Sequence, residues 1–309
     1  MAKQIKSESN VSRSKVRATL AATGSILLWC WSGVCFRKGA ELLGDMVYLT
    51  LMAGGGALTV IVIQKLRSLP LSDLYHIPLR VKLAGFFGVA LYTVMVATAF
   101  GMADPADLGQ INLIHYLWPI WMVVLGIVLL KDKPNIVMTL IGALFGLMGV
   151  AVSRDVDSFI RSPVVLVPYV LALTGGFLWA VYSVLLRKWR IPEEKGGTAF
   201  HFAVCAIISA FIAALKGQWN SMPEWSSATF FWVFFGAIGP VGLGYYWWEI
   251  GVKKGAVNLI AALAYFIPIG SSLLIGLIFK EAMSAGLLPG AILITLGAWL
   301  VRYSSRDQV

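Results

Sequence analysis

The chain has 309 residues, of which 59% are hydrophobic and 13% charged, and its mean hydropathy is +0.80. So apolar a chain lacks the polar surface of a water-soluble enzyme, and it cannot stay solvated as a disordered protein. Its formal net charge of +10 is compatible with nucleic-acid binding, unless the basic residues lie in short loops between membrane spans. Because Cys30, Cys35 and Cys205 have neither metal-ligand spacing nor an even count, no disulfide or zinc site is predicted.

Ten apolar runs are long enough to cross a bilayer as helices, which takes about 20 residues each. The sequence therefore predicts an all-α integral membrane protein with ten transmembrane helices. Residues 1–17 resemble the charged start of a signal peptide, but the run that follows has no cleavage site of small residues. They are interpreted as a cytoplasmic N-terminal tail before a permanent first span. The predicted spans are residues 18–36, 46–64, 82–102, 107–130, 135–153, 163–186, 197–215, 229–252, 256–279 and 286–303.

The basic residues predict the orientation of these spans. Of the 25 Lys and Arg residues, 19 fall on the side of the N-terminus and six on the opposite side. Because cytoplasmic loops retain Lys and Arg, both termini, including the tail 304–309, are expected in the cytoplasm. The positive charge is spread over loops, so it reports topology, and no nucleic-acid partner is expected.

The two halves of the chain match each other at a shift of about 150 residues. Each half, 18–153 and 163–303, holds five predicted spans, and an odd number inverts the second half in the membrane. Inverted repeats are typical of secondary transporters, which bind substrate near the midplane between the repeats. The sequence thus predicts two five-helix repeats around a central cavity. Matching residues include Trp29, Arg37 and Lys38 with Trp179, Arg187 and Lys188, and Tyr116 and Pro119 with Tyr265 and Pro268.

These features resemble the drug/metabolite transporter (DMT) superfamily, in its ten-span EamA-type branch. Within that branch, residues 111–119 (INLIHYLWP) and 245–249 (YYWWE) are most similar to the bacterial aromatic amino acid exporters. The resemblance implies a basket in which spans one to four and six to nine wall a central cavity, with spans five and ten behind them. It also implies a multi-pass protein of the bacterial inner membrane.

Span four carries the most informative side chains. Asn112, His115, Tyr116 and Pro119 recur at i, i+3, i+4 and i+7, so they share one face of a helix. A polar and aromatic stripe in a membrane span should face the bundle interior or a cavity. Pro119 has no N–H to donate, which leaves the carbonyl of His115 free. Two interpretations stay open: the stripe lines a substrate cavity, or it joins a kinked helix to its neighbours.

Span nine repeats the pattern with Tyr265 and Pro268, and Pro268 frees the carbonyl of Ala264. Paired kinks at corresponding positions predict that Pro119 and Pro268 act as gate or hinge residues. For aromatic rings far from the span ends, cavity lining and simple packing both remain open. The predicted substrate-binding residues are Trp29, Tyr92, Asn112, His115, Tyr116, Trp179, Tyr182 and Tyr265.

The composition of the spans restricts the substrate and the energy source. Aromatic walls suit a planar or cationic organic solute, and the absence of mid-membrane Lys or Arg argues against a phosphate-bearing solute. The chain has no Gly-Lys dipeptide, hence no phosphate-binding loop for ATP. Acidic residues lie in loops or at span ends except Glu249, which is expected to pair with Lys253. Facilitated diffusion is therefore expected, with His115 as the one candidate for proton coupling.

The sequence predicts a secondary transporter that exports aromatic and other hydrophobic amino acids from the cytoplasm by alternating access, the two halves rocking about the prolines. The alternative is an exporter of drugs or organic cations, with proton coupling left open. No histidine has a carboxylate at ligand spacing, so no enzyme activity, cofactor or metal is expected. The expected partners are a small-molecule substrate and the lipid bilayer. Glycine pairs at 142/146 and 286/290 are expected to pack within the chain, so no oligomer is required.

Overall fold

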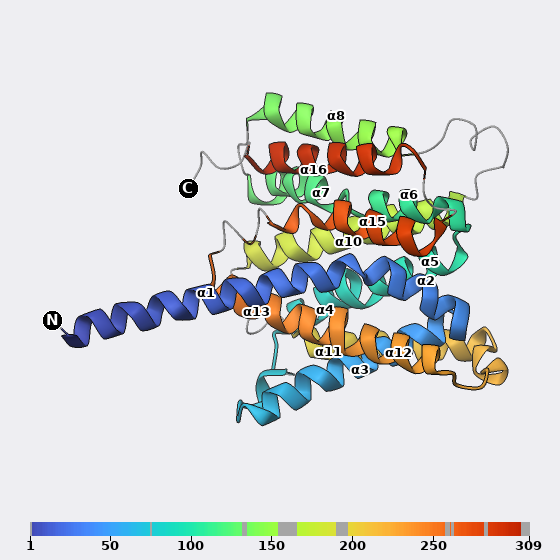
Figure 1. Ribbon diagram of the computed structural model, residues 1–309, viewed down its shortest axis with the longest axis horizontal. Helices are drawn as coiled ribbons and strands as arrows, with labels where there is room; N and C mark the ends of the chain where they lie inside the picture. Colours follow the sequence, from blue (N-terminus) through green and yellow to red (C-terminus); the bar gives the residue numbers. More distant parts are fainter. Residues whose placement is uncertain are drawn as a thin grey trace.

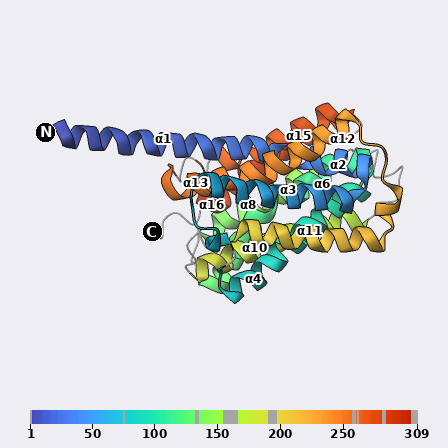
Figure 2. The ribbon, with the colours of Figure 1, turned by 90° about the horizontal axis from the view of Figure 1, so that it is seen from below.

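The computed structural model describes residues 2–74, 76–131, 135–153, 166–189, 197–256, 260, 263–280 and 284–303. Within these residues every regular element is a helix and no strand occurs. The long helices lie side by side along the long axis of the molecule, and α1 extends beyond the others (Figures 1 and 2). The predicted all-α class is confirmed.

The helices of the first half of the chain are α1 (Ala2–Cys30), α2 (Ser32–Leu43), α3 (Asp45–Leu66), α4 (Leu79–Gly85), α5 (Tyr92–Met102), α6 (Leu108–His115), α7 (Trp118–Leu125) and α8 (Ile136–Val152). Those of the second half are α10 (Leu166–Lys188), α11 (Thr198–Leu215), α12 (Ser227–Gly236), α13 (Gly244–Lys254), α15 (Ile267–Ile278) and α16 (Leu287–Tyr303). Three π-helical segments continue or join them: η2 (Phe86–Leu91), η4 (Gly126–Leu130) and η7 (Ala237–Leu243). Short 3₁₀ turns lie in loops at η1 (Leu71–Leu74), η3 (Pro105–Asp107) and η6 (Gln218–Ser221).

Among the residues that the structure describes, six helical stretches are long and apolar enough to cross a membrane, or seven if the bent pair α1 and α2 forms one span. Three further apolar helices, α8, α15 and the apolar part of α16, are shorter and lie where spans five, nine and ten are predicted. The six stretches are Asp45–Leu66, Leu79–Met102, Pro105–Leu130, Leu166–Leu186, Thr198–Leu215 and Ser227–Trp248.

The first predicted span differs from the helices that the structure contains. Residues 2–17, predicted as a tail, continue α1 because this segment contains neither Gly nor Pro. The helix bends by 42° between Cys30 and Ser32 and then continues to Leu43 instead of ending at residue 36. Gly44, with a φ of 82°, ends α2, and its N–H bonds to the carbonyl of Ala40.

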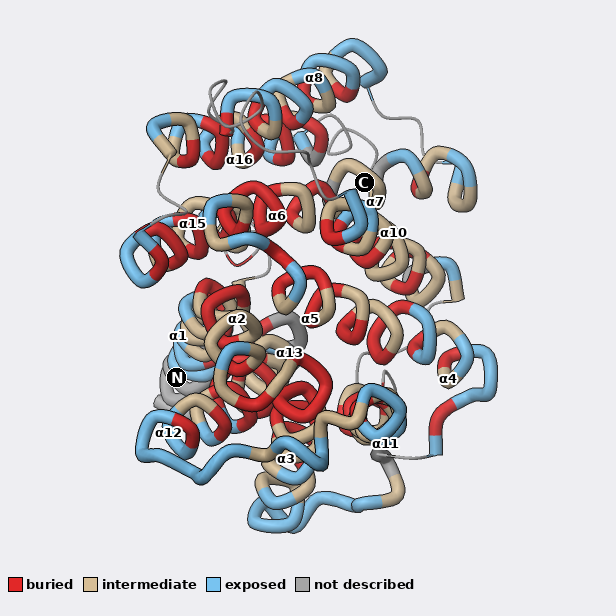
Figure 3. The backbone as a smooth tube through the Cα atoms, turned by 90° about the vertical axis from the view of Figure 1, so that its right-hand side faces the viewer, coloured by how far each residue is buried: buried red, intermediate tan, exposed pale blue. Residues whose placement is uncertain are grey.

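Glycines allow the backbones of α8 and α16 to approach each other closely at the edge of the bundle. A Cβ at Gly149 would lie 2.6 Å from the carbonyl oxygen of Gly290, and one at Gly297 would lie 2.4 Å from that of Gly142. Such contact between backbones needs small residues at the interface. The other side of α8 exposes large apolar residues, including Leu140, and α8 lies at the edge of the bundle (Figure 3). The glycine faces therefore pack within the chain.

Other close helix pairs also combine one helix from each half. α1 packs along α13, α3 along α11, and α5 along α10, and Figure 1 shows α1 beside α13 and α8 beside α16. The two halves are thus interleaved, so a motion of one whole half against the other would break the most extensive contacts in the molecule. This packing favours moving units that contain helices of both halves.

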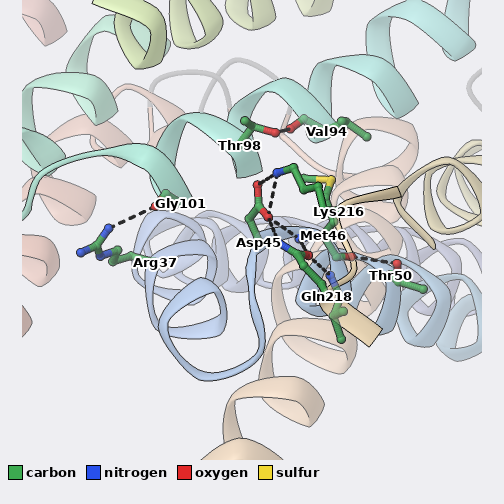
Figure 4. A network of polar contacts seen from close by, with 10 residues as sticks. Arg37, Asp45, Met46, Thr50, Val94, Thr98, Gly101, Lys216 and Gln218 are labelled. Atoms are coloured by element: carbon green, nitrogen blue, oxygen red, sulfur yellow. Dashed lines mark hydrogen bonds and ion pairs between the residues drawn. The ribbon is translucent and has the colours of Figure 1, made fainter. Parts of the chain in front are cut away.

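A buried carboxylate fixes the start of α3 to the end of α11 (Figure 4). The side chain of Asp45 is 8% exposed, and Lys216 Nζ lies 2.8 Å from its Oδ2. Gln218 Nε2 donates to Asp45 Oδ1 over 2.7 Å, while Gln218 Oε1 accepts from the N–H groups of Met46 and Val47. The N-terminus of α3 adds a favourable dipole for this negative charge. This network ties the two halves together at the end of the bundle that holds Gly44, here called the distal end.

Replacing Lys216 with methionine should lower the free energy of unfolding by about 1–2 kcal/mol, because the buried Asp45 loses its cation but keeps Gln218. The check is the thermal midpoint of the purified protein in detergent. Adding Asp45→Asn to this variant removes the unpaired charge and should restore part of the loss. A Lys216→Met protein that melts at the wild-type temperature would show that the ion pair contributes nothing to stability.

Candidate functional site

Rings from five helices form one continuous cluster in the middle of the bundle. Each ring lies within van der Waals or hydrogen-bonding reach of the next. The members of the cluster include no Lys, Arg, Asp or Glu residue. The aromatic cluster, as the term is used below, consists of Trp29 of α1, Tyr92 of α5, His115 of α6, Trp179 and Tyr182 of α10, and Tyr245 and Trp248 of α13.

Tyr92 and His115 form the polar part of the aromatic cluster. Tyr92 Oη lies 2.8 Å from His115 Nε2, and the two rings stack with centroids 5.6 Å apart and planes 21° apart. Tyr92 directly follows the π-helical segment η2, and His115 is the last residue of α6. The hydrogen bond uses one ring nitrogen of His115 and fixes the imidazole against the Tyr92 hydroxyl.

Trp179 is the ring with contacts on both sides of the aromatic cluster. Its centroid lies 5.5 Å from that of Tyr92, 5.9 Å from Tyr182 and 6.4 Å from Tyr245. These are the separations of attractive aromatic pairs. Trp179 therefore connects the Tyr92 and His115 pair to the rings of α13.

Trp29 is held by a backbone carbonyl of η7, the segment between α12 and α13. Its indole Nε1 donates to the carbonyl of Pro240 over 3.0 Å, and its ring lies 5.2 Å from Tyr245 and 5.0 Å from Trp248. Pro240 lies inside η7, where the wider π-helical turn changes the backbone hydrogen bonding. A Cβ at Gly244 would lie 2.9 Å from Trp29 Nε1, so this glycine allows the indole to approach the helix.

The break in span four occurs just before Pro119. α6 ends at His115, and α7 begins at Trp118, which places Pro119 in the first turn of the new helix. The carbonyl oxygen of His115 lies against Gly176 of α10, where a Cβ would approach it to 2.9 Å. The freed carbonyl thus faces a neighbouring helix at a position where α6 and α10 pack closely.

Asn112 and Tyr116 lie in the packed interface between the two kinked helices. Asn112 Nδ2 donates to Ser271 Oγ over 2.8 Å, and Ser271 in turn donates to the carbonyl of Pro268 over 3.2 Å. Tyr116 is buried in a cluster with Cys30 and Ile267, and its ring lies 5.0 Å from that of His115. For Asn112 the structure provides the contact that the structural interpretation of the stripe predicts.

Tyr265 precedes α15 in a turn, and its side chain is half-buried. Its carbonyl accepts a hydrogen bond of 3.0 Å from Thr295 Oγ1 of α16. Pro268 lies in the first turn of α15 and is buried. Asn258, which matches Asn112 in the repeat, lies outside the described residues, as do the side chains of Glu249 and Lys253.

Tyr245 and Trp248 are functional candidates that the sequence interpretation left out. Both are half-buried, and they belong to the aromatic run that was used only for the family resemblance. Their i, i+3 spacing places them on one face of α13, which is the same pattern that identified Trp179 and Tyr182. Phe202 of α11 packs against Tyr245 with centroids 4.9 Å apart and extends the ring contacts to α11.

Within the described part of the chain, no group of three or more His, Cys, Asp or Glu side chains could hold a metal ion.

The family model of the EamA-like transporter family matches residues 166–303. The aromatic amino acid exporter YddG of Ancylobacter novellus is 30% identical over 290 residues, which cover 92% of this chain and 96% of the relative. The chain belongs to the EamA-like transporter family. It is therefore a multi-pass membrane transporter and not an enzyme, as the sequence predicts.

Other relatives of this EamA-like transporter cover nearly the whole chain. The aromatic amino acid exporter YddG of Salmonella typhimurium is 26% identical over 307 residues, covering 94% of this chain and 99% of the relative. A solved crystal structure matches with a TM-score of 0.68 at 28% identity, covering 95% of this chain and 99% of the matched one. The predicted membership of the DMT superfamily is thus confirmed, and the transported solutes are small molecules.

Proposed function

We propose that this transporter exports aromatic and other hydrophobic amino acids from the cytoplasm and that the aromatic cluster contacts the substrate. Two relatives that match almost the full chain are named aromatic amino acid exporters. The cluster provides the chemistry for such a solute, because flat aromatic faces stack on an aromatic or apolar side chain. The single observation that carries the proposal is the connection of Tyr92 and His115 through Trp179 to Tyr245.

The accessible, uncharged rings of the aromatic cluster and the polar atoms beside them support an amino acid over a phosphorylated solute as the substrate. Tyr92, His115 and Trp179 are half-buried, whereas Val96, one turn from Tyr92, is 2% exposed. Accessible ring surface inside a bundle is available to a solute, and the Tyr92 hydroxyl and His115 imidazole offer polar atoms beside it. We therefore assign substrate contact to Trp29, Tyr92, His115 and Trp179, and Tyr182, which is 6% exposed, is kept as a candidate beside Trp179. Asn112 and Tyr116 support the cluster from the packed side, and Tyr265 is kept as a candidate.

The membrane arrangement belongs to the same proposal. We infer ten spans in two inverted five-helix repeats, with the bent pair α1 and α2 as span one and the shorter helices α8, α15 and α16 as spans five, nine and ten. The excess of Lys and Arg on the side of the N-terminus supports a bacterial inner membrane protein with both termini in the cytoplasm. Pro119 and Pro268 remain the proposed hinges, because each starts a new helix at a break in its span.

The second candidate function is export of drugs or organic cations. The uncharged rings that would stack on an aromatic amino acid also attract a cation over their faces. The carboxylate of an amino acid distinguishes the two substrate classes, since a cationic dye lacks it. The substrate test below therefore includes both.

A counterflow panel of radiolabelled amino acids and cationic dyes, measured with purified protein in liposomes, tests the proposal. We expect phenylalanine, tyrosine and tryptophan to be accumulated by the wild type. His115→Ala should lower their counterflow about tenfold, because it removes the hydrogen-bond partner of Tyr92, and Tyr265→Ala tests the remaining candidate. If dyes alone are transported, the second function holds; if neither substitution alters any solute, the site is wrong.

The same liposomes test the energy source, as a second arm of this experiment. We propose facilitated diffusion, because within the described residues the aromatic cluster contains no carboxylate that could carry a proton. Collapsing an imposed pH gradient should leave the initial rate unchanged. Transport that stops when the gradient is abolished would establish proton coupling, and His115 would then be the group to examine.

A further inference from the structure

Trp29 and Trp179 are matching residues of the two halves of the chain, but their indole N–H groups have different surroundings. The two residues match at a shift of 150, and both belong to the aromatic cluster. Trp29 Nε1 donates to the carbonyl of Pro240 over 3.0 Å, so its one donor hydrogen is used within the protein. An indole has no acceptor atom, so Trp29 can offer a solute only its ring.

The internal repeat suggests the same bond for Trp179, and the structure does not form it. Pro240 lies in η7 of span eight, which overlaps η2 of span three at the shift of 150 residues. Trp179 lies beside the end of η2, because its ring contacts that of Tyr92, the next residue along the chain. Yet no residue that the structure describes accepts a hydrogen bond from Trp179 Nε1. The two indoles therefore depart from the symmetry of the repeat.

The Trp179 N–H is also within reach of a solute. Packing seals the indole nitrogen of Trp121 in α7 without an acceptor among the described residues, but it does not seal that of Trp179, whose side chain is half-buried. The rings around Trp179 come from α5, α10 and α13, in the middle of the bundle. An accessible donor without a protein acceptor can bond to an acceptor atom of a solute. Trp179 thus combines a stacking face with an unused polar atom.

The pair of Tyr92 and His115 supplies a second donor beside Trp179. A hydrogen bond of 2.8 Å joins Tyr92 Oη to His115 Nε2. A phenol and a neutral imidazole hold one donor hydrogen each, and the bond between them uses only one. If the histidine donates, the Tyr92 hydroxyl hydrogen is left, and if the tyrosine donates, the hydrogen on His115 Nδ1 is left. In either tautomer the pair keeps one hydrogen for a third group, and the Tyr92 ring is centred 5.5 Å from that of Trp179.

A carboxylate has the chemistry that these two donors require. Its two oxygens only accept, and the aromatic cluster has no acidic member that would compete for the donors. An amino acid is a zwitterion, so it carries its own ammonium group and needs no protein cation as a counter-ion. The rings of Tyr245 and Trp248, centred 5.2 and 5.0 Å from that of Trp29, form an uncharged face that attracts such an ammonium group.

We propose that the substrate carboxylate binds to Trp179 Nε1 and to the remaining donor hydrogen of the Tyr92 and His115 pair, while Trp29 contributes only its ring. The inference rests on the proposed function and adds the chemical group by which the cluster recognises its substrate. Because a donor left without its acceptor is costly, the same two donors disfavour an amine or dye that lacks a carboxylate. The site therefore selects a zwitterion over an organic cation.

A purely stacking role for Trp179 is the other explanation, and the two roles predict different selectivity. Loss of a stacking face weakens every aromatic solute by the same factor, because the ring of the solute makes the contact. Loss of a carboxylate donor weakens only the solutes that carry a carboxylate. Phenylalanine and phenylethylamine separate the two effects, since they share the phenyl ring and the ammonium group and differ in the carboxylate.

The test measures how strongly each compound inhibits counterflow of labelled phenylalanine in liposomes that contain the full-length protein. The wild type should bind phenylalanine at least about tenfold more tightly than phenylethylamine. Trp179→Phe keeps an aromatic ring but lacks the N–H, so it should lower this ratio about tenfold. Trp29→Phe is the matched control, because it removes an indole N–H that is bonded to Pro240 and should change both inhibition constants by the same factor.

A second variant controls for the size of the ring. It carries 3-benzothienylalanine at position 179, in which sulfur replaces the indole N–H in a ring of nearly the same shape, and it should show the same tenfold lower ratio. This variant also serves if Trp179→Phe fails to fold. Equal inhibition by both compounds in the wild type would overturn the proposal, as would an unchanged ratio in either folded Trp179 variant.

Failure of the proposed function gives a different result from failure of this inference. A wild type without amino acid counterflow removes the proposed function and the carboxylate contact with it. Counterflow of phenylalanine with ratios that do not change leaves the proposed function intact and removes only the carboxylate contact.

Discussion

Replacing Trp179 with alanine should lower the initial rate of aromatic amino acid export about ten- to a hundredfold at matched protein levels. The substitution removes ring contacts to Tyr92, Tyr182 and Tyr245 in one step. Each aromatic pair contributes about 0.5–1.5 kcal/mol beyond the area that it buries. A substrate that stacks in the same cluster loses its central partner. The measurement is efflux of labelled phenylalanine from preloaded liposomes.

Two further variants separate the loss of the ring from the loss of the fold. Trp179→Phe keeps an aromatic face and should retain part of the rate. Trp225→Ala removes an indole that is 37% exposed before α12, outside the aromatic cluster, and should export at the wild-type rate. Thermal midpoints of all three proteins show whether the fold is preserved. Wild-type efflux by a folded Trp179→Ala protein would contradict the assignment of Trp179 to the substrate site.

Local spacing predicted the ring contacts within one helix but not those between helices. Trp179 and Tyr182 stand at i, i+3, and their centroids lie 5.9 Å apart as that spacing implies. Tyr92 and His115 are 23 residues apart, and their hydrogen bond depends on where the π-helical segment η2 rotates the start of α5. No periodicity in the sequence reveals a π-helical turn, so this contact could not be predicted.

The stripe of span four shows how a break changes a helical face. The i, i+3, i+4, i+7 rule assumes an uninterrupted helix from Asn112 to Pro119, but α6 ends at His115 and a tighter turn follows, in which the Leu117 N–H bonds to the carbonyl of Ile114. Residues on the two sides of the turn therefore no longer share one face. His115, the last residue of α6, joins the aromatic cluster, whereas Tyr116, in the turn itself, packs with Cys30 and Ile267. Pro119 predicted a break, but the neighbour that each side chain meets depends on how the two helices pack.

Hydropathy located apolar segments better than it located helix ends. The apolar run predicted as span nine covers 256–279, and a turn at 265–266 interrupts it before α15 begins at Ile267, because the prolyl ring of Pro268 is accepted in a first helical turn and not in a helix interior. The first helix extends beyond its apolar run because residues 2–17 contain neither Gly nor Pro to end it. Transfer energy determines which residues leave water, whereas caps and prolines determine where a helix starts.

The glycine contact between α8 and α16 provides the second large effect. Gly149→Ala should lower the free energy of unfolding by about 3 kcal/mol, at the upper end of the usual cost of overpacking, because the obstacle is backbone. The new Cβ would lie 2.6 Å from the carbonyl oxygen of Gly290 and 2.9 Å from the N–H nitrogen of Ile294, so the helices must separate. The measurement is the thermal midpoint and the monodisperse yield in detergent.

Gly54→Ala is the matched control, because both glycines lie in helices and receive the same methyl group. At Gly54 of α3 the new Cβ would meet only Ala206 Cβ at 3.5 Å, an ordinary contact, and the better helix former should stabilise the protein by about 0.5–1 kcal/mol. A Gly149→Ala protein that melts like the wild type would show that α8 and α16 are not held by their glycines. Because neither helix contributes a ring to the aromatic cluster, the Gly149→Ala protein that does fold should export at the wild-type rate per molecule. Its defect is then opposite to that of Trp179→Ala, which folds and fails to transport.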